Sequence, residues 1–203
     1  MGDLTKLSES LLDLQKNLQI LPGIGEKSAQ RLAYFIVNQP KEKVLQLSSA
    51  IERAITNCKP CTECFILTDS NPCIICSDEN RDKQILCVVE SSRDVYSIEN
   101  TREFHGYYFV LGNLLSPING IGPNEIRTEE LKQFINKKSF TEIILALSPS
   151  TEGETTMMFL ADCLNTISAK ITRLSTGIPY GSDMEYTASS TLLNAFKRRF
   201  TIS

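Results

Sequence analysis

Four cysteines in two pairs constrain this chain more than any other feature of its sequence. Two residues separate the members of each pair and eight separate the pairs, which are Cys61 with Cys64 and Cys73 with Cys76. Each pair can fold into a knuckle that points both sulfurs at one place, and two knuckles complete a tetrahedron. A shell closed by four thiolates leaves no position for water. The spacing therefore predicts a structural zinc site rather than a catalytic one.

Two disulfides, or four unrelated buried thiols, are the alternatives. The start of the chain lacks the pattern of a secretion signal, and cysteine-rich secreted domains are usually shorter, so both alternatives are less favoured. Cys58 lies three residues before Cys61 and is a further candidate ligand. Cys87 and Cys163 lie in apolar runs, where we expect core thiols.

Length and charge set limits on the kind of protein. The 203 residues allow one good core with small attachments, and no apolar run approaches 18 residues, so we expect no membrane span. A net charge of -3 gives no general attraction to nucleic acid, so any DNA binding must come from a local patch. Residues 1–60 carry eight Lys and Arg against six Asp and Glu, a local excess of two positive charges.

The first segment reads as an amphipathic helix. Its leucines recur at steps of three and four, which places them on one helical face: Leu4, Leu7, Leu11, Leu14 and Leu18. That face can pack on the core of this chain or on the same helix of a second subunit, and the sequence leaves both possibilities open.

A glycine hairpin comes next, with Gly23 and Gly25 inside Leu-Pro-Gly-Ile-Gly, before helical spacing resumes from Glu26 to Val37. Such glycines let the backbone turn tightly and approach a phosphate, while the second helix points free N–H groups at it. Lys27 and Arg31 lie one helical turn apart, so both cations can face one phosphate backbone. The pattern predicts a helix-hairpin-helix that binds DNA without reading bases. A simple turn that binds nothing is the alternative.

A third helix is predicted after Pro40, with its apolar positions at Val44, Leu47, Ile51 and Ile55, and it leads into the cysteine pairs. The polar stretch Asp78 to Lys83 is the candidate boundary between the cysteine pairs and the next domain.

From residue 84 short apolar runs alternate with helical patterns. The runs are typical of strands buried on both faces of a parallel sheet, and the whole predicts an α/β layer. The predicted strands are Ile85–Val89, Tyr107–Leu111, Ile143–Leu147 and Ile171–Leu174, and the predicted helices are Ser92–Asn100, Thr128–Lys137 and Thr155–Ala169.

Acidic residues come after two of these strands. Glu90 and Asp94 come after the first strand, and Glu152 and Glu154 come after the third. In a parallel sheet the chemistry collects at the carboxyl ends of the strands, where carboxylates can gather Mg²⁺. The same residues can instead cap helix N-termini. Spacing alone leaves the two roles open.

The order of these features resembles the bacterial RecR family of recombination proteins along nearly the whole chain. The matching motifs are Leu21-Pro22-Gly23-Ile24-Gly25 with Lys27 and Arg31, the four cysteines, Cys87-Val88-Val89-Glu90, Leu115-Ser116-Pro117, Gly120-Ile121-Gly122-Pro123, Glu152-Gly153-Glu154, and Gly177-Ile178-Pro179 with Gly181.

The resemblance implies a multi-part α+β protein. Its parts would be a helix-hairpin-helix head over 1–57, a four-cysteine zinc finger over 58–79, a Toprim domain with a parallel sheet over 80–175, and a C-terminal helical tail over 176–203. The implied metal ligands are Cys61, Cys64, Cys73 and Cys76, and the implied DNA-binding residues are Gly23, Gly25, Lys27 and Arg31. Glu90, Asp94, Glu152 and Glu154 would form an acidic cluster for partner or DNA contacts.

The resemblance also implies a role without turnover. With RecO, and in some settings RecF, such proteins help to load RecA onto single-stranded gaps coated by SSB. They form dimers and ring-like tetramers, so an acidic chain can encircle DNA with a basic inner lining. A cytoplasmic, nucleoid-associated protein without a membrane span is expected. The competing hypothesis is a Toprim enzyme, a nuclease or strand-passage fragment, in which Glu90, Glu152 and Glu154 hold Mg²⁺.

Overall fold

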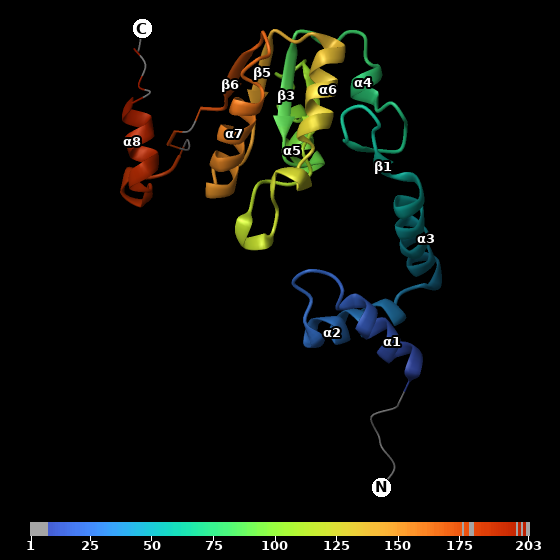
Figure 1. The fold of residues 1–203 in the computed structure, drawn as a ribbon. Helices are drawn as coiled ribbons and strands as arrows, with labels where there is room; N and C mark the ends of the chain where they lie inside the picture. The colour runs from blue at the N-terminus through green and yellow to red at the C-terminus, as the bar shows by residue number, and fades with distance from the viewer. Residues whose placement is uncertain (1–7, 176, 179–180, 198, 200, 202–203) are drawn as a thin grey trace. The chain divides into compact units, whose positions relative to one another are not determined.

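The chain divides into two compact units, Met1–Cys58 and Lys59–Ser203. A computed structural model describes residues 8–175, 177–178, 181–197, 199 and 201 (Figure 1). The unit boundary falls just before the cysteine pairs, so the pairs belong to the same unit as the sheet. The polar stretch at residues 78–83 lies inside that second unit.

Three helices make up the first unit: α1 (Glu9–Leu18), α2 (Glu26–Val37) and α3 (Lys41–Asn57). Ser8 caps α1 by accepting a hydrogen bond from the Leu11 N–H at 3.3 Å. Helix α1 packs on α2, where Ala29 and Ala33 are fully buried. Two alanines four residues apart share one helical face and let the neighbouring helix approach closely. Of the predicted leucine stripe, Leu4 and Leu7 lie outside the described residues, and Leu11, Leu14 and Leu18 are half-buried.

Helix α3 forms where it was predicted, but its apolar side chains are largely exposed. Ile55 is 77 % exposed, and Leu47 and Ile51 are each more than half exposed, whereas Val44 is half-buried. None of the described residues of α3 is buried. The helical spacing is therefore confirmed without a core contact to account for it.

The second unit opens with the cysteine pairs. A short antiparallel ribbon joins β1 (Lys59–Pro60) to β2 (Leu67–Thr68), and the single-turn helix α4 (Ile74–Ser77) overlaps the second pair. The first cysteine pair lies in the turn of the ribbon and the second lies at α4, so each pair occupies a tight local turn.

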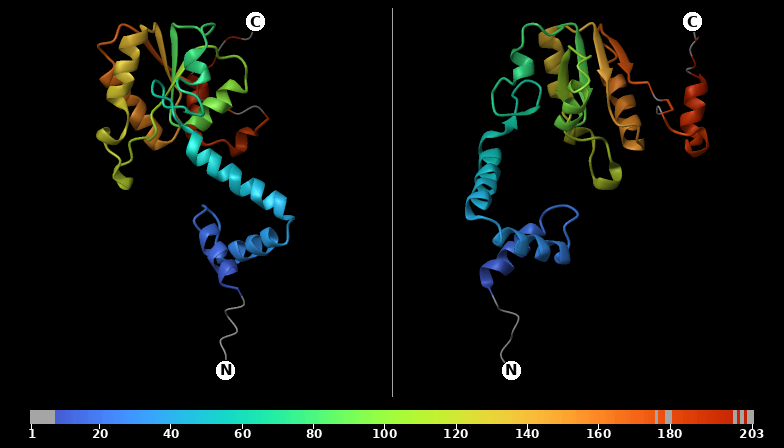
Figure 2. Two further views of the ribbon diagram at one scale, coloured as in Figure 1. Left: turned by 90° about the vertical axis from the view of Figure 1, so that its right-hand side faces the viewer. Right: turned by 180° about the vertical axis from the view of Figure 1, so that it is seen from behind.

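A four-stranded parallel sheet forms the body of this unit, as predicted. Its strands lie in the order β4 (Tyr107–Val110), β3 (Ile85–Val89), β5 (Glu142–Leu145) and β6 (Lys170–Arg173). The connecting helices are α5 (Ser92–Glu99), α6 (Thr128–Lys138) and α7 (Thr151–Cys163). Helices α6 and α7 cover one face of the sheet and α5 covers the other (Figure 2). The chain steps from β3 to β4 in one direction and then returns past β3 to β5 and β6. Because both kinds of crossover are right-handed, the helices of the two directions lie on opposite faces.

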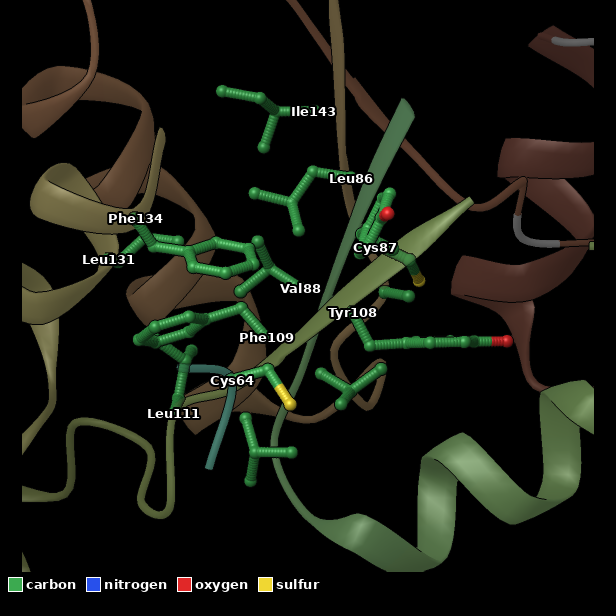
Figure 3. Close-up of a cluster of buried hydrophobic side chains, with 14 of the residues drawn as sticks. Cys64, Leu86, Cys87, Val88, Tyr108, Phe109, Leu111, Leu131, Phe134 and Ile143 are labelled. Carbon is green, nitrogen blue, oxygen red and sulfur yellow. The ribbon is translucent and has the colours of Figure 1, made fainter. Parts of the chain in front are cut away.

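The core lies between the sheet and these helices. Leu86, Val88 and Phe109 point toward α6, where Leu131 and Phe134 meet them, whereas Cys87 and Tyr108 lie on the other side of the strands (Figure 3). Successive side chains of a strand point to opposite faces, so both faces of the sheet are buried. The cysteine knuckles belong to the same core cluster, and Phe65 packs edge-on against Phe109 with ring centroids 5.4 Å apart.

Between β4 and α6 the chain forms a fixed hairpin rather than a loose loop. It contains two short 3₁₀ helices, Pro117–Asn119 and Pro123–Glu125, and a backbone bridge between Ser116 and Ile121. The Leu115 N–H donates to Thr156 Oγ1 at 2.8 Å, which ties the base of the hairpin to α7. After β6 come a 3₁₀ turn (Met184–Tyr186) and α8 (Ser189–Lys197). Across the described parts of the chain, no helix has the length and apolarity needed to span a membrane.

A partly buried charge network closes the sheet edge near residue 81. The Arg81 guanidinium forms a two-pronged ion pair with Glu99 and also donates to the Gly106 carbonyl at 3.0 Å. The Tyr108 hydroxyl donates to Glu99 Oε1 at 2.7 Å. The Arg81 hydrogen bond lowers the pKa of Glu99, and burial, followed by the contact with Glu99, raises the pKa of Tyr108. Arg81, which lies in the polar stretch predicted as a domain boundary, is therefore held against the sheet by this network.

This network predicts acid sensitivity. Because the pKa of Glu99 is lower in the folded chain, its stabilisation is complete above the ordinary value near 4.5 and is lost as pH falls through the folded pKa. We expect Glu99→Gln to cost about 1.5–3 kcal/mol at pH 7 and to flatten the decline of stability below pH 5. Urea unfolding at several pH values measures both effects. Glu103→Gln, a nearby exposed change, is the control, and an unchanged acid slope in Glu99→Gln would contradict the assignment.

Candidate metal centre and phosphate-binding hairpin

The four predicted cysteines converge. Their sulfurs all lie within 4.8 Å of one another, with Cys61, Cys64 and Cys73 buried and Cys76 half-buried. A tetrahedral ion with sulfur ligands at about 2.3 Å places those sulfurs about 3.8 Å apart. The Cys64 and Cys73 sulfurs are 3.5 Å apart, close to that edge and far beyond the bonding distance of a disulfide, about 2.05 Å. All four thiols are free. The donor set and its spacing fit a metal ion.

Backbone hydrogen bonds set the shape of the first knuckle. The Cys61 N–H donates to the Ile66 carbonyl at 2.8 Å, and the Phe65 N–H donates back to the Cys61 carbonyl at 3.0 Å. Phe65 takes a positive φ of 63° to close this turn. The Asn71 side chain accepts from the Thr62 N–H at 3.1 Å and so joins the first knuckle to the segment before the second.

In the second knuckle, N–H groups point at sulfur. The Cys76 N–H donates to Cys73 Sγ at 3.4 Å, and the Cys73 N–H donates to Cys61 Sγ at 3.4 Å. Such donors stabilise thiolates. Hydrogen bonds from Cys64 and then Cys76 lower the pKa of the Cys73 thiol, while contacts within the same group raise the pKa of Cys64 and of Cys76. Four thiolates this close together repel one another, so the fully deprotonated set requires a cation among them.

The other cysteines lie apart from this group. Cys58 is half-buried and does not belong to the cluster of four. Cys87 is buried in β3, where burial raises the pKa of its thiol to about 12, as expected of a core thiol. Cys163, which was also expected in the core, is half-buried at the end of α7.

The glycine hairpin presents open backbone. Gly23 has a φ of +80°, a conformation that other residues rarely adopt, so the turn requires glycine there. Gly25 is the N-cap of α2 and supplies no side-chain hydrogen bond to the first turn. Nothing lies within 4 Å of the position of a Cβ on either glycine. The first N–H groups of α2 are therefore open to an anion.

Both predicted cations stand beside this opening. Lys27 and Arg31 are exposed on α2, and neither forms an ion pair with another residue of the described chain. They lie one turn apart along the helix, so their charges add to the positive end of its dipole. The first turn also contains Glu26, which is exposed.

The acids after the first strand have different surroundings. Asp94 Oδ2 accepts from the Ser91 N–H at 2.8 Å and completes a capping box at the start of α5. Glu90 is half-buried, and burial, with the nearby Asp94 charge, raises its pKa. The capping role, one of the two predicted for these acids, accounts for Asp94.

The acids of the third strand require a correction. Residues 152–154 were expected before a helix spanning 155–169, but they form the first turn of α7, which begins at Thr151 and ends at Cys163. Ser150 caps this helix through the Gly153 N–H at 3.1 Å. A Cβ at Gly153 would lie 1.9 Å from the Ser148 carbonyl oxygen, so only glycine fits at this position. Gly153 lies inside the first turn of α7 rather than before the helix.

Sequence inspection missed the partner of Glu154. Arg173, at the end of β6, forms a two-pronged ion pair with it, with Nη1 2.7 Å from Oε2. The two residues are nineteen positions apart, and only the adjacency of α7 and β6 brings them together.

Within the described chain, the four cysteines are the only group of three or more Cys, His, Asp or Glu side chains placed to share an ion.

Known families match both units. The family model described as "RecR, helix-hairpin-helix" matches residues 11–55, and the Toprim domain model matches residues 84–175. A recombination protein RecR of Gloeobacter violaceus is 43 % identical over 189 residues, which cover 93 % of this chain and 96 % of the relative. The chain belongs to the RecR family. RecR proteins of Heliobacterium modesticaldum and Paenarthrobacter aurescens are 42 % and 44 % identical, each over 92 % of this chain and 94 % of the relative.

Membership of the RecR family fits the geometry at each point. The RecR helix-hairpin-helix match covers the open glycine turn and both exposed cations, and the Toprim domain match covers the parallel sheet with all three connecting helices. The four-cysteine group lies between the two matched ranges. The predicted fold class, a helix-hairpin-helix followed by a four-cysteine centre and a Toprim sheet, is confirmed.

Proposed function

We propose that this chain is a DNA-binding mediator of recombinational repair that acts without turnover. The observation that carries the proposal is the hairpin, where open N–H groups at the start of α2 stand beside the exposed cations Lys27 and Arg31. These groups suit a phosphate backbone of any sequence. Gly23 and Gly25 allow the close approach.

The metal in this proposal is zinc, held by Cys61, Cys64, Cys73 and Cys76. Four thiolates suit a d¹⁰ ion with no directional demand. When bound, zinc would supply a fixed cross-link between the two knuckles and the positive charge that four neighbouring thiolates need. The knuckles pack on the sheet core, so the cross-link supports the Toprim unit rather than any reaction.

The partners proposed are RecO and, in some settings, RecF, with RecA loading at SSB-coated gaps as the outcome. The protein acts as a homodimer or ring tetramer in the cytoplasm, associated with the nucleoid. A ring would reconcile DNA binding with the net charge of -3, because only its inner lining has to be basic. The four functional parts are those set by residues 1–57, 58–79, 80–175 and 176–203.

The non-enzymatic role is supported by how the acidic residues are engaged. Asp94 caps α5 and Glu154 pairs with Arg173, so two of the four candidate acids serve structure. The remaining two, Glu90 and Glu152, are proposed for contacts with DNA or a partner. A Toprim enzyme would instead need carboxylates gathered around Mg²⁺.

A loading assay tests the function. RecA assembly on SSB-coated gapped DNA should accelerate when this chain and its RecO partner are both present, and neither alone should suffice. Mg²⁺ with this chain should leave the DNA uncut. Cleavage that depends on Mg²⁺ and disappears in Glu90→Gln would contradict the mediator proposal and support the Toprim enzyme hypothesis.

A further inference from the structure

Helix α6 has a cation at each end, and both cations reach the first cysteine knuckle. Arg127 immediately precedes the helix, and Lys138 is its last residue. Between them the buried side chains Leu131, Phe134 and Ile135 fix α6 on the sheet. Because the middle of α6 is anchored on the sheet, the positions of Arg127 and Lys138 at its two ends are fixed as well.

Arg127 holds the residue that comes after Cys64. Its guanidinium lies 4.5 Å from the centroid of the Phe65 ring, and its Nη1 donates to the Val110 carbonyl at 3.1 Å. The Val110 N–H in turn donates to the Cys64 carbonyl at 2.9 Å. The Arg127 guanidinium thus contacts both Phe65, the residue after Cys64, and Val110, the β4 residue that hydrogen bonds to Cys64. A planar cation over an aromatic face contributes about 0.5–2 kcal/mol.

Lys138 holds the residue that precedes Cys64. Its Nζ lies 3.1 Å from Glu63 Oε2 and stands over two rings, 4.4 Å from the centroid of Tyr107 and 5.4 Å from that of Phe134. The Lys138 side chain is 25 % exposed and that of Glu63 is 40 % exposed, so the pair is partly shielded from water.

We infer that Arg127 and Lys138 are positioning residues for the metal centre. They grip Phe65 and Glu63, the two neighbours of Cys64, from opposite ends of one helix. Cys64 is thereby held from both sides, with its sulfur 3.5 Å from that of Cys73. Pre-organised ligands lose less conformational freedom when the ion binds, so the grip raises metal affinity and slows release. The inference rests on the zinc assignment made for the proposed function.

Zinc transfer to a colorimetric chelator tests the inference on the full chain. We expect Arg127→Met and Lys138→Met to release zinc about 10-fold faster or more, the lower end of the usual effect of outer-shell changes. Arg127→Lys should release zinc at a rate between those of wild type and Arg127→Met, because it keeps the charge and loses the planar stack. Lys138→Arg keeps the positive charge toward Glu63, so it should release zinc more slowly than Lys138→Met. The matched control is Lys132→Met, which removes a charge from the same helix where its partner is Glu129, at 2.9 Å.

Cobalt substitution separates positioning from a general loss of stability. The absorption of thiolate-bound Co²⁺ reports ligand geometry, so it should change in Lys138→Met and stay unchanged in Lys132→Met. Glu63→Gln should match Lys138→Met, and the double variant should release zinc no faster than either single one. The comparison of Glu63→Gln, Lys138→Met and the double variant still tests the inference if an Arg127 variant fails to fold.

Each outcome decides a separate point. Wild type that holds zinc, with all variants releasing it at the control rate, would overturn the positioning role while leaving the metal in place. Wild type purified without zinc, and unable to take up Co²⁺, would overturn the metal assignment and this inference with it. Faster release confined to the Arg127, Lys138 and Glu63 variants supports the inference.

Discussion

Replacing Lys27 and Arg31 together by Ala is expected to weaken binding to gapped duplex DNA on the order of 100-fold at about 0.1 M salt. Each phosphate contact releases about 0.9 counterion, so two lost contacts also reduce the slope of log affinity against log salt by about 1.8. Neither side chain forms an ion pair within the described chain, so their removal should leave the fold intact. Fluorescence anisotropy over a series of salt concentrations measures both quantities.

The control for this change removes two other exposed cations of the same unit. Lys41→Ala with Lys43→Ala gives the same change in net charge at the start of α3, away from the glycine turn. The control should bind almost as wild type. Equal weakening of the two double variants would mean a general charge effect, and an unchanged slope in Lys27→Ala/Arg31→Ala would place the DNA surface elsewhere. Absence of binding by wild type itself would indicate that a partner must first engage the DNA.

Cys64→Ala should abolish stoichiometric zinc binding and lower the thermal midpoint by about 10 °C or more. Cys64 is fully buried, and its sulfur lies beside Cys73 at the centre of the cluster. Without it three thiols remain, and the two knuckles lose their shared cross-link. Hydrogen exchange should quicken over residues 59–77, while the hairpin of the first unit keeps its phosphate contacts.

Two other cysteine variants control this experiment. Cys58→Ser and Cys163→Ser should each keep one zinc per chain, because neither residue belongs to the cluster of four. Full metal content and an unchanged melting temperature in Cys64→Ala would mean that Cys58 replaces the missing ligand. Loss of metal in Cys58→Ser would mean that Cys58 is itself a metal ligand.

Local spacing determined much of this protein from sequence alone. The two cysteine pairs fix a knuckle each, because two intervening residues suffice for the turn that aims both sulfurs together. The turn at Gly23, the helix after it and the apolar runs of the sheet are likewise local patterns, and the structure contains them where they were expected. Short-range geometry depends on neighbours in the chain, and those are visible in a sequence.

Tertiary structure decided what each side chain faces. Glu154 was a candidate metal ligand until β6 placed Arg173 beside it, and Asp94 took its capping role from the exact start of α5. The grip of Arg127 and Lys138 on the first knuckle joins residues more than sixty positions apart. No periodicity signals such contacts, because they depend on how the sheet brings distant helices together. The sequence therefore determined the elements and the metal-ligand spacing, whereas packing determined which charges are paired and which remain open to a ligand.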